Sequence, residues 1–281
     1  MGELIRVSRG LWRPPESVND LAGRCRALLA VLPPGTVIAG LAAARLHGFW
    51  LPEPRFDEPV EVITRGVGQV PRELAASERS EVHARRRRLG RPEVDLVDGI
   101  PVTCEARTWV DLAEVLPMAD LVAAGDSVLR DRTSRRELEL FVRDAWGRRG
   151  VVSARAALEL LDERSRSRPE SHLRFRLVEA GLPRPEVNHP IHDDHGQWIA
   201  EPDLHYKRAR LALEYNGTDH AEPKQMRKDI TRGLDVVRAG WMTLTFGPAQ
   251  VFTRWDDTVS LVRTFLDARD PAWRARRGAA G

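Results

Sequence analysis

Lysine and cysteine are scarce in this sequence of 281 residues. Lysine occurs only at positions 207, 224 and 228, so that 41 of the 44 basic residues are arginine. Cys25 and Cys104 are too few for a disulfide framework, and they lack the paired spacing of a zinc site. The basic chemistry of the chain is therefore guanidinium chemistry, which suits bidentate contacts with phosphate.

Long hydrophobic runs are also missing. No apolar run approaches the roughly 20 residues that a membrane span requires, and the first residues lack the apolar core of a signal peptide. The sequence contains no Walker-type loop, dinucleotide fingerprint or serine elbow. Because 42% of the residues are hydrophobic, the chain can form a sizeable core. We expect a soluble, cytoplasmic protein without a membrane partner, and the sequence does not indicate its oligomeric state.

Residues 1–160 alternate short strands and helices, which predicts an α+β domain. Apolar residues on one helical stripe indicate helices, short runs rich in valine and isoleucine indicate strands, and Asp98-Gly99 is typical of a hairpin turn. Helices are expected over 17–32, 36–49, 103–117, 118–130 and 133–146 and from Ser153 onward, and strands are expected within 5–14, 59–65 and 80–86.

The charged stretch DERSRSR interrupts this pattern, and we place a domain boundary near residue 165. Over 165–270 the order becomes helix, strands, helix, strand, helix, which predicts an α/β domain with a central mixed sheet flanked by helices. Strands over 186–194 and 197–206 are expected to pair around a turn at 193–196. The last residues, 271–281, are expected to form a flexible basic tail.

Two carboxylates in the segment EPDLHYKRARLALEY lie where neighbouring strands are expected. Adjacent strands lie about 4.8 Å apart, so Asp203 and Glu214 can approach closely enough to share a hard divalent cation. Magnesium would relieve their repulsion and activate a water toward a phosphodiester. From spacing alone, the alternative stays open that Asp203 caps a turn after Pro202 and that Glu214 points to solvent.

The second half resembles the PD-(D/E)xK nuclease superfamily, and more closely its branch related to very-short-patch repair endonucleases. The motifs EPDL, ALEYNG and KDITRGLDVVRAGWMTLTF carry this resemblance, which covers about residues 165–268. It implies a restriction-endonuclease-like fold in which Asp203 and Glu214 hold Mg²⁺ or Mn²⁺. It also implies catalytic or orienting roles for further residues, namely Glu170, His220, Asp229 and Arg232.

Asn216 stands where the superfamily carries its lysine, two positions after the second acid. Asparagine supplies no positive charge to the attacked phosphate. Either Lys224 or Lys228 supplies an ammonium group from the next helix, or the clustering of lysines here is chance. The departure leaves turnover at this site open.

Other polar groups have structural explanations as well as functional ones. His189, His192 and His195 recur every three residues, which fits a solvated hairpin tip better than a zinc site, because a strand sends such residues to opposite faces. His47 is expected to be a satisfied core histidine. The arginine run at 83–91 either grips a nucleic-acid backbone or forms a solvated loop.

The first half resembles the abortive-infection type IV antitoxins, a group of transcriptional regulators. The segments RVSRGLWRP, VIAGLAAARLHGFWLP, VEVITRG and GIPVTCEARTWVDLAEVL carry the resemblance. That group often begins with a winged helix-turn-helix, and this sequence begins at what resembles the wing strand, so we expect a truncated winged-helix module at the start. The resemblance implies DNA and a toxin or regulatory protein as partners.

Two main hypotheses follow. The first is a metal-dependent DNA endonuclease that hydrolyses phosphodiester bonds with a cation held by Asp203 and Glu214. The second is an antitoxin-like DNA-binding transcriptional regulator with a catalytically degenerate nuclease fold, which Asn216 favours. An RNA-directed enzyme is a third alternative.

Overall fold

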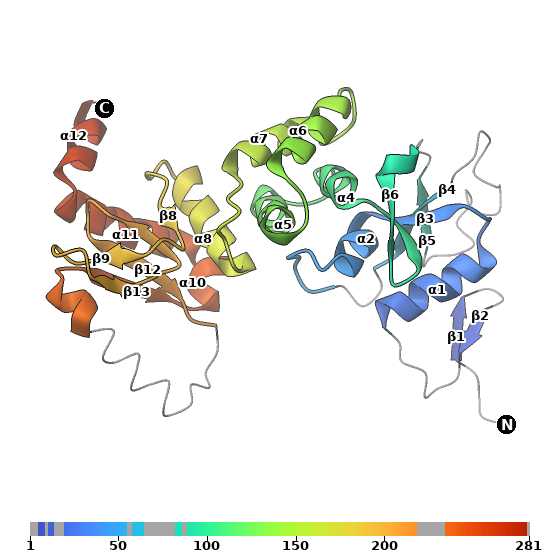
Figure 1. Cartoon of the computed structure of the whole chain (residues 1–281), viewed down its shortest axis with the longest axis horizontal. Coiled ribbons are helices and arrows are strands. Elements are labelled where there is room, and N and C mark those ends of the chain that lie inside the picture. The colour runs from blue at the N-terminus through green and yellow to red at the C-terminus, as the bar shows by residue number, and fades with distance from the viewer. Residues whose placement is uncertain are drawn as a thin grey trace. The chain divides into compact units, whose positions relative to one another are not determined.

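The computed structural model divides the chain into two compact units, residues 1–159 and 160–281 (Figure 1). The structure describes residues 5–8, 11–13, 20–54, 58–64, 82–85, 89–217 and 234–279. The expected mixture of α and β, with mixed sheets flanked by helices, is confirmed. The division into two separate domains, with a boundary near residue 165, remains a prediction.

A five-stranded mixed sheet with the order β5-β4-β3-β7-β6 forms the centre of the first unit. Its strands are β3 (Thr36–Ala39), β4 (Val60–Thr64), β5 (Val82–Arg85), β6 (Val94–Val97) and β7 (Ile100–Thr103). The pairs β4–β5 and β3–β7 are parallel, whereas β3–β4 and β6–β7 are antiparallel. A separate hairpin joins β1 (Ile5–Ser8) to β2 (Leu11–Arg13).

The hairpin expected at Asp98-Gly99 is confirmed, because these residues connect β6 to β7. Their φ angles are 49° and 76°. A two-residue turn of the type that matches strand twist requires positive φ at both positions, which glycine and aspartate tolerate better than most residues.

Residues 36–39 correct the sequence prediction of one helix over 36–49. They form β3, a central strand of the sheet, and helix α2 spans only Gly40–Leu46. Thr36, Val37 and Ile38 are buried, and their β-branched side chains pack well on a pleated surface but lose rotamer freedom in a helix. A strand buried on both faces shows no polar alternation, so periodicity alone does not separate it from a helix.

The remaining helices of the first unit follow from apolar stripes and local caps. They are α1 (Leu21–Val31), α4 (Glu105–Leu112), α5 (Met118–Asp131), α6 (Arg135–Asp144) and α7 (Val151–Leu160). The Asp20 side chain caps α1 by accepting a hydrogen bond from the Gly23 amide. In α4 the buried Arg107 is paired with Asp111 at 2.8 Å and with Glu93, so its charge is compensated.

The second unit is built on a four-stranded mixed sheet with the order β13-β12-β11-β8. Its strands are β8 (Glu186–Val187), β11 (Leu204–Tyr206), β12 (Leu211–Tyr215) and β13 (Met242–Phe246). β11 is antiparallel to both β8 and β12, and β13 is parallel to β12. A hairpin of β9 (Ile191–His192) and β10 (Trp198–Ala200) encloses the expected turn at 193–196.

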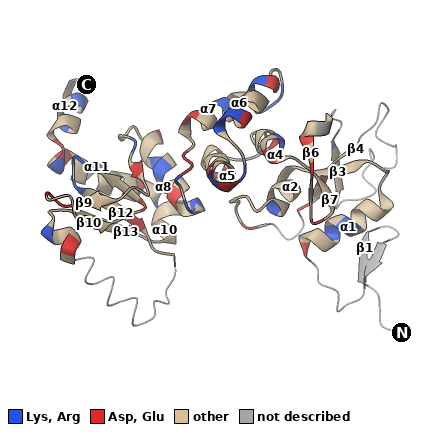
Figure 2. Ribbon diagram, in the orientation of Figure 1, with Lys and Arg blue, Asp and Glu red and all other residues tan. Residues whose placement is uncertain are grey.

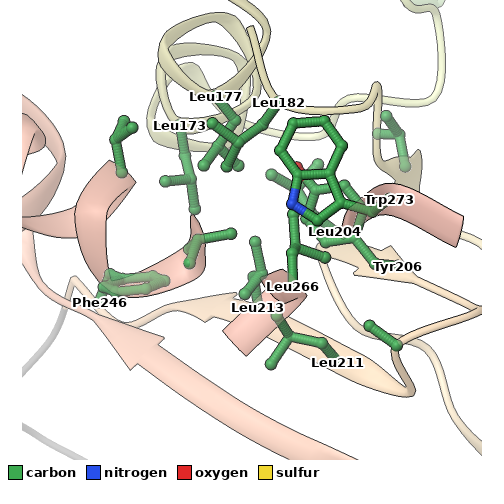
Figure 3. Packing of buried hydrophobic residues seen from close by; sticks show 14 of the residues in the cluster. Leu173, Leu177, Leu182, Leu204, Tyr206, Leu211, Leu213, Phe246, Leu266 and Trp273 are labelled. Atoms are coloured by element: carbon green, nitrogen blue, oxygen red, sulfur yellow. The ribbon is translucent and has the colours of Figure 1, made fainter. Parts of the chain in front are cut away.

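Helices α8 (Arg168–Glu179) and α11 (Trp255–Arg269) pack on this sheet through one apolar core (Figure 3). Leu173 from α8, Leu266 from α11 and Leu213 from β12 are all buried in it. Full burial of one such side chain contributes roughly 1.5–3 kcal/mol relative to exposure. The shorter helices α10 (Pro248–Phe252) and α12 (Pro271–Ala279) complete the unit.

The C-terminal residues differ from the expected flexible tail. Residues 271–279 form α12, and the Asp270 side chain caps its start by accepting hydrogen bonds of 3.0 Å from the amides of Ala272 and Trp273. Trp273 is 8% exposed and belongs to the core of the second unit. Burial of this one aromatic ring attaches an otherwise arginine-rich segment to the unit.

Candidate acidic site

Asp203 and Glu214 lie at the same end of the β11–β12 ladder. β11 pairs with β12 through Leu204 and Leu213, and one further step of this antiparallel register brings Asp203 opposite Glu214, on the same face of the sheet. The Tyr215 amide donates a hydrogen bond of 2.7 Å to Asp203 Oδ2 and so holds that carboxylate against β12. The structure thus brings together the two acids that were expected to share a cation.

The surroundings of Asp203 disfavour its charge. Burial, and after it the nearby negative charges of Glu170 and Glu214, raise the pKa of the Asp203 carboxyl from 3.8 to about 6. The Tyr215 amide and the Arg166 guanidinium act in the opposite direction. At neutral pH the ionised carboxyl is therefore costly, and either a proton or a cation would relieve it.

Glu170 is the third acid of this neighbourhood, but its oxygens already accept hydrogen bonds. It is buried in the first turn of α8. Oε1 accepts from the Ser167 hydroxyl at 2.8 Å, and Oε2 accepts from the Arg166 amide at 2.9 Å and the Asn188 side chain at 2.7 Å. This arrangement is a helix-capping one. Glu170 therefore stabilises the start of α8 and contributes negative charge, more than a free ligand, to the site.

Asn188 links the acids, and the sequence analysis did not identify it. Its backbone N–H donates a hydrogen bond of 2.9 Å to the Asp203 carbonyl oxygen. Its side-chain Nδ2 donates another, also of 2.9 Å, to the Arg164 carbonyl oxygen. Its φ of 42° is a conformation in which asparagine is enriched. The Ser-x-x-Glu spacing of 167–170 is a capping signal in the sequence, whereas the role of Asn188 depends on the pairing of β8 with β11.

The nuclease resemblance also implies roles for residues between positions 218 and 233, which the structure does not describe. His220, Lys224, Lys228, Asp229 and Arg232 lie outside the described residues. Asn216, which stands in the place of the superfamily lysine, lies just after β12. Its backbone N–H donates a hydrogen bond of 2.9 Å to the Phe246 carbonyl oxygen and so joins the ends of β12 and β13.

Asp203 and Glu214 provide carboxylate donors of the kind that a hard divalent cation binds. In the described part of the chain, no group of three or more His, Cys, Asp or Glu side chains is arranged to hold a metal ion. Mg²⁺ is nevertheless often bound through one or two carboxylates, with water and phosphate oxygens as its other ligands. The chemistry of Asp203 and Glu214 fits such a partial shell.

His47 and the three histidines of the 189–195 segment lie in the environments that the sequence predicts for them. His47 is buried, and its Nε2 lies 2.8 Å from the Thr103 carbonyl oxygen, as expected for a core histidine. His189, His192 and His195 are exposed around the β9–β10 hairpin, as expected for a hairpin tip. Residues 86–88 of the arginine run lie outside the described residues, so its contact with nucleic acid stays a prediction.

Comparison with known proteins identifies relatives of this chain. Residues 37–162 match the family model of the AbiEi antitoxin C-terminal domain. Two Mycobacterium tuberculosis proteins are each 35% identical to this chain over 243 residues, which is 85% of this chain and 84% of theirs. They are named uncharacterized protein MT2308 (strain CDC 1551 / Oshkosh) and uncharacterized protein Rv2248 (strain ATCC 25618 / H37Rv).

The crystal structure of the RV2827C protein from Mycobacterium tuberculosis is 25% identical, with a TM-score of 0.39, and the match covers 56% of this chain and 60% of that chain. Among the described residues, no helix has the length and apolar character to cross a membrane. The resemblance of the second half to nucleases stays a prediction. At the identity and coverage given above, the chain belongs to the same family as MT2308 and Rv2248, and residues 37–162 form its AbiEi antitoxin-like part.

Proposed function

We propose that this protein is an antitoxin-like regulator, which acts by binding and without turnover. The match of residues 37–162 to the AbiEi antitoxin C-terminal domain carries the proposal. From this match we infer two kinds of partner, DNA and a toxin or regulatory protein.

Exposed apolar side chains in the antitoxin-like part are suited to a protein partner. Trp146 and Val152 are 80% and 76% exposed, and tryptophan is enriched among the residues that dominate the binding energy of protein interfaces. Replacing an exposed side chain leaves the core intact. Trp146→Ala is therefore expected to weaken partner binding without lowering stability.

Features of the acidic site favour binding over hydrolysis. Asn216 supplies no positive charge at the place of the superfamily lysine. Glu170 uses both oxygens to cap α8, so it contributes negative charge to the site more than a metal ligand. On this proposal, the second unit is a nuclease-like platform for binding.

A metal-dependent endonuclease is the second candidate, and one observation favours it. Asp203 and Glu214 lie opposite each other, and the raised pKa of Asp203 is what two acids prepared for a cation would show in its absence. These two residues would then hold Mg²⁺, whose chemical contribution is to activate a water at neutral pH. His220 would orient or deprotonate that water, and Arg232 would pair with Asp229 or meet the phosphate, as the nuclease resemblance implies.

Assays of DNA binding and DNA cleavage separate the two candidates. The purified protein is tested for a mobility shift with DNA upstream of its own gene in EDTA, and for nicking of supercoiled plasmid in Mg²⁺ or Mn²⁺. If the protein is a regulator, it shifts the upstream DNA but not scrambled DNA, and it leaves plasmid intact. The variant Asp203→Asn/Glu214→Gln then shifts the upstream DNA as the wild type does. Metal-dependent nicking that this double variant loses would instead establish the endonuclease, and a missing shift would contradict DNA binding.

A further inference from the structure

We propose that the second unit binds a phosphoryl group in a small pocket beside the turn between β11 and β12. The pocket has a volume of about 230 Å³. Asp203 precedes β11, whereas Lys207 and Arg208, which line the pocket, follow it. The pocket is thus at the opposite end of the strand from the acidic site, and the inference is independent of the function proposed above.

Basic side chains dominate the pocket. Four of them line it, namely Arg184, Lys207, Arg208 and Arg276. Arg276 comes from α12, along which basic positions recur (Figure 2). Two acids, Glu186 and Asp270, also line the pocket, so the basic side chains outnumber the acidic ones by four to two. The small volume therefore faces a net positive charge, which attracts an anion.

One residue that lines the pocket carries a buried polar atom without a hydrogen-bond partner in the part of the chain that the structure describes: the hydroxyl oxygen of Tyr206, which is 7% exposed. His205, the preceding residue of β11, faces the other side of the sheet, where its ring packs against Trp241. Buried polar groups are nearly always paired, so an orphaned group calls for a ligand or a bound water. A tyrosine hydroxyl can donate a hydrogen bond to a phosphoryl oxygen.

Both the pocket size and its donor chemistry select a phosphoryl group. Sites for whole drug-sized ligands have volumes of about 300–1,000 Å³, so this pocket is smaller than such sites and suits a small group such as a phosphoryl group. Guanidinium groups bind phosphate oxygens in bidentate geometry. Arg184 is already positioned, because it donates a hydrogen bond of 2.8 Å to the Leu161 carbonyl oxygen. The ligand is free phosphate or the phosphate end of a longer molecule that extends into solvent.

Calorimetric titration of the full chain with inorganic phosphate tests the inference. We expect saturable binding that weakens about tenfold or more in Lys207→Gln/Arg208→Gln, because charge-assisted hydrogen bonds are lost. Tyr206→Phe should weaken it less, without lowering the unfolding midpoint of the free protein. Arg254→Gln, which changes an exposed arginine elsewhere in this unit, is the control that should leave the affinity unchanged. Absence of saturable binding, or equal affinity in Lys207→Gln/Arg208→Gln, would overturn the inference.

Three further titrations identify the source of the phosphoryl group. A short oligonucleotide with a 5′-phosphate is compared with its 5′-hydroxyl form and with a nucleoside monophosphate. Preference for the phosphorylated oligonucleotide over both assigns the pocket to nucleic-acid ends. Equal binding of the monophosphate and the phosphorylated oligonucleotide assigns it to small phosphate esters. If the 5′-phosphate and 5′-hydroxyl forms bind equally, the pocket does not recognise phosphoryl groups, and the inference is wrong.

Discussion

Replacement of Asp203 by asparagine should stabilise this protein at neutral pH. Folding raises the pKa of the carboxyl from 3.8 to about 6, so the folded state binds more protons than the unfolded state between these values. The contribution of Asp203 to the free energy of unfolding therefore falls as pH rises through this window. A difference of about two pK units at 1.36 kcal/mol each amounts to about 3 kcal/mol. Asparagine does not ionise, but it still accepts the Tyr215 hydrogen bond.

Urea denaturation in unit steps from pH 4 to pH 8 measures this effect. Asp203→Asn should match the wild type near pH 4 and exceed it by up to about 3 kcal/mol at pH 7 and above. Glu163→Gln is the matched control, since it removes a negative charge from an exposed position of the same unit. Its difference from the wild type should be small. A variant less stable than the wild type at pH 7, or a difference that does not change with pH, would refute the electrostatic reasoning.

Further variants test the supporting structure. Glu170→Ala removes the acceptor of three hydrogen bonds at the start of α8, and we expect it to lower the free energy of unfolding in urea by about 3 kcal/mol; an unchanged value would show that the cap is dispensable. Gly150→Ala should lower the melting temperature strongly, because its Cβ would lie 2.6 Å from the Ala113 backbone at a φ of 78°. Gly147→Ala is its control, since Gly147 has a similar φ with nothing within 4 Å, and it should cost only about 1–2 kcal/mol. Similar melting temperatures for the two glycine variants would contradict the contact.

Local patterns in the sequence were enough to predict much of the fold. The Asp98-Gly99 turn and the turn at 193–196 follow from turn residues flanked by strand-like runs. Residues 36–39 were misassigned, because a strand buried on both faces has no alternating pattern. Helix α12 packs on the second unit through the buried side chain of Trp273. This is a tertiary contact, and no periodic apolar pattern in the sequence of the helix indicates it.

The candidate site was predictable only in outline. The expected strand positions and the nuclease resemblance both indicate that Asp203 and Glu214 meet, and the register of β11 with β12 brings them together. The hydrogen bonds that occupy the Glu170 carboxylate could be anticipated from the Ser-x-x-Glu spacing, which is a local capping signal. No local pattern in the sequence indicates the role of Asn188, because its hydrogen bonds to Glu170 and to the Asp203 backbone form only when distant segments pack together.

Depletion of this protein in its native host tests the proposed regulator most directly. Loss of an antitoxin frees its toxin, so growth should stop on depletion. Growth should return on expression of the wild type or of Asp203→Asn/Glu214→Gln, and Trp146→Ala should restore it poorly. Normal growth after depletion, or a rescue that requires both acids, would contradict an antitoxin that acts by binding alone.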